Sequence, residues 1–81
     1  MILVNGELQA SISAYDRGLA YGDGVFRTLA VRDGQAQCWP SQFAKLCADC
    51  RRLDISTPAE PSLRAEVALV ARDLALGSVK I

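Results

Sequence analysis

The chain has 81 residues, enough for one small domain, and its nine basic residues balance nine acidic ones. Hydrophobic residues make up 51% of it, which on so small a body predicts a surface that another domain or subunit covers. The balanced charge, without a basic cluster, argues against nucleic acid and anionic membrane as partners. No apolar run approaches the roughly 18 residues of a membrane span, and the N-terminus lacks the basic region of a signal peptide, so we expect a cytoplasmic protein.

The residue types limit the chemistry that the chain can perform alone. It contains no histidine, so neither a Ser-His or Cys-His pair nor a histidine-based metal site can form. The odd number of cysteines, Cys38, Cys47 and Cys50, is typical of reduced thiols without a bound metal. Because Cys47 and Cys50 fall on one apolar helical stripe, we interpret them as small core residues.

The N-terminal quarter predicts a hairpin and then an irregular segment. Residues 1–11 are typical of two short strands around an Asn5-Gly6 turn. Residues 14–24 predict a loop or irregular helix, in which Asp16 caps a single turn. The sequence from Gly22 to Gly24 lacks the Lys-Ser/Thr of a phosphate-binding Walker loop and follows no strand, so we interpret its glycines as a turn with positive φ or close packing.

A second hairpin is predicted after this segment. Its first arm runs from Val25 to Val31, its turn is centred on Asp33-Gly34, and its return arm runs from Gln35 to Trp39. Pro40 suits the first turn of a helix that follows. The apolar stripe of this helix is formed by Phe43, Leu46, Cys47, Cys50 and Leu53.

The last third predicts a second helix and the start of a strand. Ser62 is the expected N-cap and Gly77 the expected stop, and residues 78–81 begin a strand. The apolar face of this helix holds Leu63, Val67, Val70, Ala71 and Leu74. Strands followed by helices predict an α+β fold, a small antiparallel sheet of hairpins with two helices packed on it. Because the chain ends inside a predicted strand, we expect it to be a piece of a longer protein.

The two lysines have different interpretations. Lys45 lies in the first half of a predicted helix, where the helix dipole mildly disfavours a cation. It is either a solvated surface residue or an anion ligand at a domain boundary. Lys80 is interpreted as a strand-surface lysine, because nothing around it predicts the pocket that a nucleophilic lysine needs.

The stretch "DRGLAYGDGVFRT", residues 16–28, resembles the N-terminal signature of the fold-type IV pyridoxal-phosphate enzymes. The order of features agrees: a "VNGE" hairpin precedes it, and the helix "SQFAKLCADCRRLDI" follows where the family often has His-x-x-Arg-Leu. With Phe26 included, the sequence of this stretch is most similar to that of the aminodeoxychorismate lyases. Branched-chain or D-amino-acid aminotransferases are the alternatives within the family, and a free-standing non-enzymatic binding module is the alternative outside it.

The resemblance implies that residues 1–81 form the small N-terminal domain of a two-domain enzyme. The larger domain then carries the cofactor-binding lysine, so no catalytic residue is expected here. Lys45 stands where the family has an arginine on the cofactor phosphate, and Phe26 stands on the wall of the substrate pocket. The implied cofactor is pyridoxal 5'-phosphate, the partner a small-molecule substrate, and the intact enzyme a homodimer. For a lyase, the reaction would give 4-aminobenzoate and pyruvate for folate synthesis.

Overall fold

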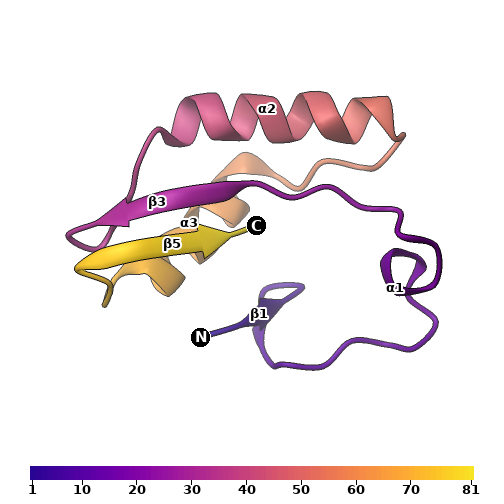
Figure 1. Cartoon of the computed structure of the whole chain (residues 1–81), viewed down its shortest axis with the longest axis horizontal. Helices are drawn as coiled ribbons and strands as arrows, with labels where there is room; N and C mark the ends of the chain where they lie inside the picture. The colour runs from indigo at the N-terminus through magenta and orange to yellow at the C-terminus, as the bar shows by residue number, and fades with distance from the viewer.

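A three-stranded antiparallel sheet lies at the centre of the chain, as seen in a computed structural model that describes all residues from 1 to 81 (Figure 1). β3 (Thr28–Arg32) is the middle strand, between β4 (Gln35–Ala36) and β5 (Leu76–Lys80). Two helices, α2 (Trp39–Arg52) and α3 (Glu60–Ala71), connect β4 to β5. The chain therefore returns to the sheet only after both helices are complete.

The two helices cover one face of this sheet, and the core lies between the helices and the sheet. Burial alternates along β3, where Leu29 and Val31 are buried and Thr28, Ala30 and Arg32 are exposed, because successive side chains of a strand point to opposite faces. Together with the helices they form one apolar cluster, which consists of Leu29, Val31, Trp39, Val67, Ala71 and Val79. The predicted α+β fold is confirmed, and the other face of the sheet is left exposed.

A second, two-stranded sheet precedes the centre. β1 (Leu3–Val4) pairs with β2 (Glu7–Leu8) around Asn5 and Gly6, whose φ angles are 54° and 81°. Positive φ at both central residues is the geometry that an Asn-Gly hairpin turn favours, so this prediction is confirmed. The tip of the hairpin approaches α3, where a Cβ on Gly6 would lie 3.1 Å from a carboxylate oxygen of Glu66.

The predicted single turn after this hairpin is a short helix, α1 (Arg17–Tyr21). The carboxylate of Asp16 accepts a 2.8 Å hydrogen bond from the Gly18 backbone N–H, as expected for an N-cap. The helix ends at Gly22, which has a left-handed φ of 72°. The sequence predicted the cap at Asp16 and a positive φ in the Gly22–Gly24 stretch, but not that the helix ends at Gly22.

The second hairpin is shorter than predicted. Its turn is confirmed, since Asp33 and Gly34 have φ angles of 51° and 75°. The return strand ends at Ala36, however, and the prediction that it extends to Trp39 is wrong. Cys38 adopts a left-handed φ of 58° that turns the chain into α2, so Trp39 becomes the first helical residue and buries its indole in the core.

The apolar stripe of α2 is confirmed at its centre and wrong at its end. Pro40 lies in the first turn as expected, and Leu46 and Cys50 are buried. Leu53 is 53% exposed, because the helix ends at Arg52 and the chain turns away before Leu53 can reach the core.

The second helix starts earlier than predicted. α3 begins at Glu60 with Ala59 at its N-cap position and no side-chain cap, so the expected capping by Ser62 is wrong. Pro61 in the first turn accounts for the early start, since its φ is already set to the helical value. The apolar face is confirmed by the burial of Val67 and Ala71.

Gly77 does not stop this helix. α3 ends at Ala71, and Gly77 lies within β5 opposite Val31. Before β5 starts, the Leu74 N–H donates a 2.9 Å hydrogen bond to the Ala71 carbonyl, and Leu74 packs against the core. The predicted terminal strand is confirmed and begins two residues earlier, at Leu76.

Candidate functional site

The exposed sheet face carries an aromatic ring covered by an ammonium group. β3 and β5 pair Thr28 with Lys80, and two backbone hydrogen bonds of 2.9 Å between Arg27 and Ile81 extend this pairing. The register places Lys80 beside Phe26, with the Lys80 Nζ 4.5 Å from the centroid of the ring. Phe26 is 61% exposed. The exposed ammonium of Lys80 is suited to an anionic ligand, and the ring supplies an apolar surface beside it.

Lys80 was interpreted as a surface lysine, and its exposure confirms this. Its position on Phe26 was missed, because the two residues lie near opposite ends of the central fold in sequence. Only the antiparallel pairing of β3 with β5 brings them together. Alternation along the strand places Lys80 on the opposite face from Val79. It does not identify the strand that pairs with β5.

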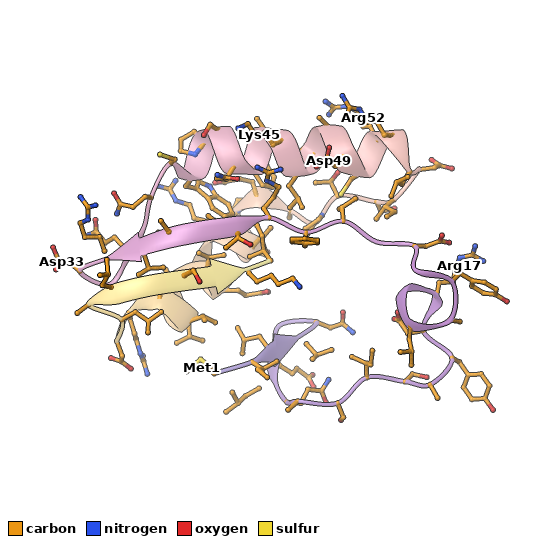
Figure 2. All side chains as sticks on the ribbon, in the orientation of Figure 1. Met1, Arg17, Asp33, Lys45, Asp49 and Arg52 are labelled. Atoms are coloured by element: carbon orange, nitrogen blue, oxygen red, sulfur yellow. The ribbon has the colours of Figure 1, made fainter.

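Lys45 lies on the exposed side of α2 (Figure 2). Its ammonium forms no salt bridge and no side-chain hydrogen bond within the chain. Its charge is therefore available to an anion outside this chain, as a point charge and not as the two-pronged donor of an arginine.

Arg27 connects the strand that follows Phe26 to the helix that carries Lys45. Its Nε donates a 2.9 Å hydrogen bond to Oε1 of Gln42, and its Nη1 lies 3.9 Å from Oδ2 of Asp49. Gln42 and Asp49 are three residues before and four residues after Lys45, so all three lie along one side of α2. Phe26 and Lys45 share no direct interaction, but the contacts of Arg27 with Gln42 and Asp49 connect the strand after Phe26 to the helix that carries Lys45.

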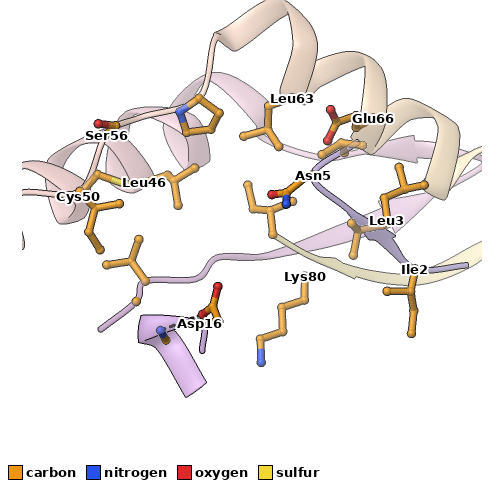
Figure 3. Close-up of a pocket in the computed structure, with 18 of the residues that line it drawn as sticks. Ile2, Leu3, Asn5, Asp16, Leu46, Cys50, Ser56, Leu63, Glu66 and Lys80 are labelled. Atoms are coloured by element: carbon orange, nitrogen blue, oxygen red, sulfur yellow. Dashed lines mark hydrogen bonds between the residues drawn. The ribbon is translucent and has the colours of Figure 1, made fainter. Parts of the chain in front are cut away.

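A cavity of about 1260 Å³ lies between the N-terminal hairpin, the two long helices and the end of β5 (Figure 3). Its apolar wall includes Leu46, Cys50 and Val67, and Lys80 projects from β5 toward the side where Asp16 lies. Ligand pockets are typically about 300–1,000 Å³, so this is an open groove more than a closed site. Neither predicted site residue, Lys45 or Phe26, lines it.

The glycine-rich stretch between residues 16 and 28 forms a short helix and a turn closed by a salt bridge. Gly22 has a positive φ, and a Cβ on Gly18 would lie 2.9 Å from a carboxylate oxygen of Asp16. Arg17 and Asp23 form a 2.7 Å salt bridge across the turn. Gly24 has neither a positive φ nor a close neighbour, so the prediction of positive φ or close packing is confirmed for Gly22 and not for Gly24.

All three cysteines are free thiols. Cys50 is buried in the interior as predicted, Cys47 is half-buried, and Cys38 is exposed. No group of three or more His, Cys, Asp or Glu side chains is arranged to hold a metal ion. None of the helices combines the length and the apolar character that crossing a membrane requires.

Two solved structures superpose on nearly the whole chain. The crystal structure of 4-amino-4-deoxychorismate lyase from Pseudomonas aeruginosa is 43% identical, with a TM-score of 0.79 over 94% of this chain and 28% of that one. A hypothetical aminotransferase from Mycobacterium tuberculosis, in its PLP-bound form, is 30% identical, with a TM-score of 0.82 over 99% of this chain and 29% of that one. The chain is a relative of the fold-type IV pyridoxal-phosphate enzymes.

A curated protein supports the same relationship. Aminodeoxychorismate lyase from Vibrio harveyi is 34% identical over 58 residues, which are 72% of this chain and 21% of that protein. No family model matches the chain. The chain thus spans between a fifth and three tenths of the length of these fold-type IV relatives, and the resemblance based on residues 16–28 is confirmed.

Proposed function

We propose that this chain is the small N-terminal domain of a pyridoxal-phosphate-dependent lyase that converts 4-amino-4-deoxychorismate into 4-aminobenzoate and pyruvate. The supporting observation is the 43% identity to 4-amino-4-deoxychorismate lyase over 94% of the chain, against 30% for the aminotransferase. In this proposal, the enzyme is a cytoplasmic homodimer that acts in folate synthesis. The larger domain of each subunit carries the cofactor-binding lysine.

The residues of this chain fit a supporting role at such a site. Lys45 has an exposed, unpaired ammonium, which is the donor that a phosphate monoester requires. Phe26 supplies an accessible apolar wall, and Lys80 on its ring supplies a positive charge for a carboxylate of the substrate. When bound, pyridoxal phosphate supplies an electron sink for the carbanion at the amine-bearing carbon of the substrate.

An aminotransferase is the second candidate. It is supported by the TM-score of 0.82 with the PLP-bound aminotransferase over 99% of the chain. Fold does not determine reaction type, so similar domains serve both reactions. A free-standing binding module is the candidate of another class, and it is supported by the large exposed hydrophobic side chains, such as Leu8, Tyr15 and Leu76.

An assay of the full-length protein separates these candidates. The lyase proposal expects 4-aminobenzoate and pyruvate in equal amounts from 4-amino-4-deoxychorismate, with no requirement for a 2-oxo acid. Transfer of an amino group from branched-chain or D-amino acids to a 2-oxo acid, without release of 4-aminobenzoate, would support the aminotransferase. Absence of both activities in pyridoxal-phosphate-loaded protein would favour the binding module.

The role of Lys45 is tested by cofactor affinity. Lys45→Ala should weaken binding of pyridoxal phosphate to the intact apo-enzyme about tenfold to a hundredfold, because hydrogen bonds to charged groups contribute roughly 1.5–3 kcal/mol. Lys45→Arg should bind at least as tightly, since the guanidinium retains the charge and adds a second donor. The measurement is a titration followed by the absorbance of the bound cofactor.

The solvated interpretation of Lys45 makes the opposite prediction. A surface lysine should tolerate alanine within about 0.5 kcal/mol. Equal affinities for wild type and Lys45→Ala would therefore show that the phosphate is held by the rest of the enzyme alone.

A further inference from the structure

We propose that Arg27 is a positioning residue that keeps Asp49 from pairing with Lys45, and thereby leaves the Lys45 ammonium free for an anionic ligand. The proposal deepens the proposed function, because it rests on Lys45 serving the cofactor phosphate. The observation behind it is that Lys45 forms no ion pair with Asp49, although the two residues are four apart on α2.

Lys45 and Asp49 are four residues apart on α2, so their side chains lie on the same side of the helix. At this spacing a lysine and a carboxylate attract each other, although the order with the lysine first is the weaker one. Lys45 nevertheless forms no salt bridge. Both oxygens of Asp49 are engaged elsewhere: Oδ2 lies 3.9 Å from Nη1 of Arg27, and Oδ1 lies 3.7 Å from Nη1 of Arg52.

Arg27 is the better anchored of these two arginines. Its side chain is 28% exposed, whereas that of Arg52 is 80% exposed and gains little from an ion pair in water. The guanidinium of Arg27 is fixed by the hydrogen bond to Gln42, and its backbone is fixed by the two hydrogen bonds to Ile81. Arg27 therefore contacts Oδ2 of Asp49 from the strand side, and Asp49 is the carboxylate with which Lys45 would otherwise pair.

Loss of the guanidinium should release Asp49 to Lys45. In Arg27→Gln, we expect the Lys45–Asp49 pair to form and to lower the availability of the ammonium about twofold, the size of a helix pair at this spacing. Replacing Asp49 with Asn in the same background removes the competing carboxylate and should restore availability. A purely structural role of Arg27 would not be rescued by Asp49→Asn.

The test uses the intact protein without its cofactor. Trace acetylation with a limiting amine-reactive reagent, followed by peptide mass spectrometry, gives separate rate constants for the two lysines of the chain. We expect Arg27→Gln to lower the rate at Lys45 about twofold, as the pair spacing implies, and Arg27→Gln with Asp49→Asn to restore it. Arg27→Lys, which keeps a cation for Asp49, is the matched control and should retain the wild-type rate, while Lys80 serves as the internal reference.

An unchanged Lys45 rate in Arg27→Gln, or a lowered rate that Asp49→Asn does not restore, would overturn the proposal. Should Arg27→Gln lose its helical circular dichroism, Arg27→Met gives the same test. It removes the guanidinium and leaves Asp49 and Lys45 in place, so the Lys45 rate must again fall. An unchanged rate in folded Arg27→Met would overturn the proposal as well.

A second readout connects the inference to the cofactor. In the intact enzyme, Arg27→Gln should weaken pyridoxal-phosphate affinity about twofold, with recovery on adding Asp49→Asn. If Lys45→Ala leaves this affinity unchanged, the phosphate role of Lys45 fails. The acetylation rates still decide independently whether Arg27 keeps Asp49 away from Lys45.

Discussion

At the scale of single residues, Gly34 is the glycine with the least room for a side chain. Its φ is +75°, and a Cβ there would lie 2.7 Å from the backbone oxygen of Arg72. Both the backbone conformation and the lack of space therefore disfavour a side chain. We predict that Gly34→Ala lowers the free energy of unfolding by more than about 1 kcal/mol, measured from the midpoint of a urea transition.

Gly22 is the matched control for this prediction. Its φ of +72° is nearly the same, but no atom lies within 4 Å of the position of its Cβ. Gly22→Ala should therefore cost only the backbone strain of a left-handed alanine, roughly 1 kcal/mol. Equal losses in the two variants would show that the approach of Arg72 to Gly34 does not matter.

At the scale of elements, α3 lacks a cap that the sequence could have provided. Ala59 has the extended backbone of an N-cap, with φ −61° and ψ 129°, but it has no side-chain acceptor for the free N–H groups. We predict that Ala59→Ser stabilises the chain by about 0.5–2 kcal/mol, the usual contribution of an N-cap hydroxyl. The measurement is the shift of the urea midpoint at constant m-value.

Ser62 provides the control for the cap. It is exposed within the helix and not at its start, so Ser62→Ala should change the free energy of unfolding by less than about 0.5 kcal/mol. A loss near 1 kcal/mol in Ser62→Ala, together with no gain in Ala59→Ser, would place the functional start of the helix at Ser62 after all.

At the scale of the whole molecule, the core is small and the apolar surface large. Eight of 81 residues are buried, whereas many large hydrophobic side chains are more than half exposed. We therefore expect the 81-residue chain alone to show neither lyase nor aminotransferase turnover. Both of its lysines are exposed, and Lys80 lines an open groove, so neither has the buried apolar surroundings that would make it a nucleophile.

Incubation with pyridoxal phosphate and 4-amino-4-deoxychorismate, followed by assays for pyruvate and 4-aminobenzoate, checks this expectation. Borohydride reduction and peptide mapping then locate any covalent attachment of the cofactor. A stoichiometric adduct at Lys45 or Lys80 that accompanies turnover would contradict the assignment of the chemistry to a larger domain.

The sequence by itself determined the features that depend on neighbouring residues. Positive φ at Asn5-Gly6 and Asp33-Gly34 follows from the local preferences of those residues, and both turns were predicted correctly. Pro40 likewise marked the start of α2. The predicted N-cap at Ser62 was wrong, because a second local signal, Pro61, starts the helix earlier. Local signals thus identified the two turns and the first turn of α2, but neither the start nor the end of α3.

The tertiary structure alone decided the contacts on which the candidate site depends. Three sets of contacts join segments that are far apart in the chain. They are the pairing of β3 with β5, the contact of Lys80 with the Phe26 ring, and the contacts of Arg27 with Gln42 and Asp49. The periodicity of apolar residues predicts which face of a helix or strand a residue occupies. It does not predict which other element packs against that face. The partner and its register are determined only when the apolar faces pack together, because a shift of one residue would turn every buried side chain of a strand to the solvent.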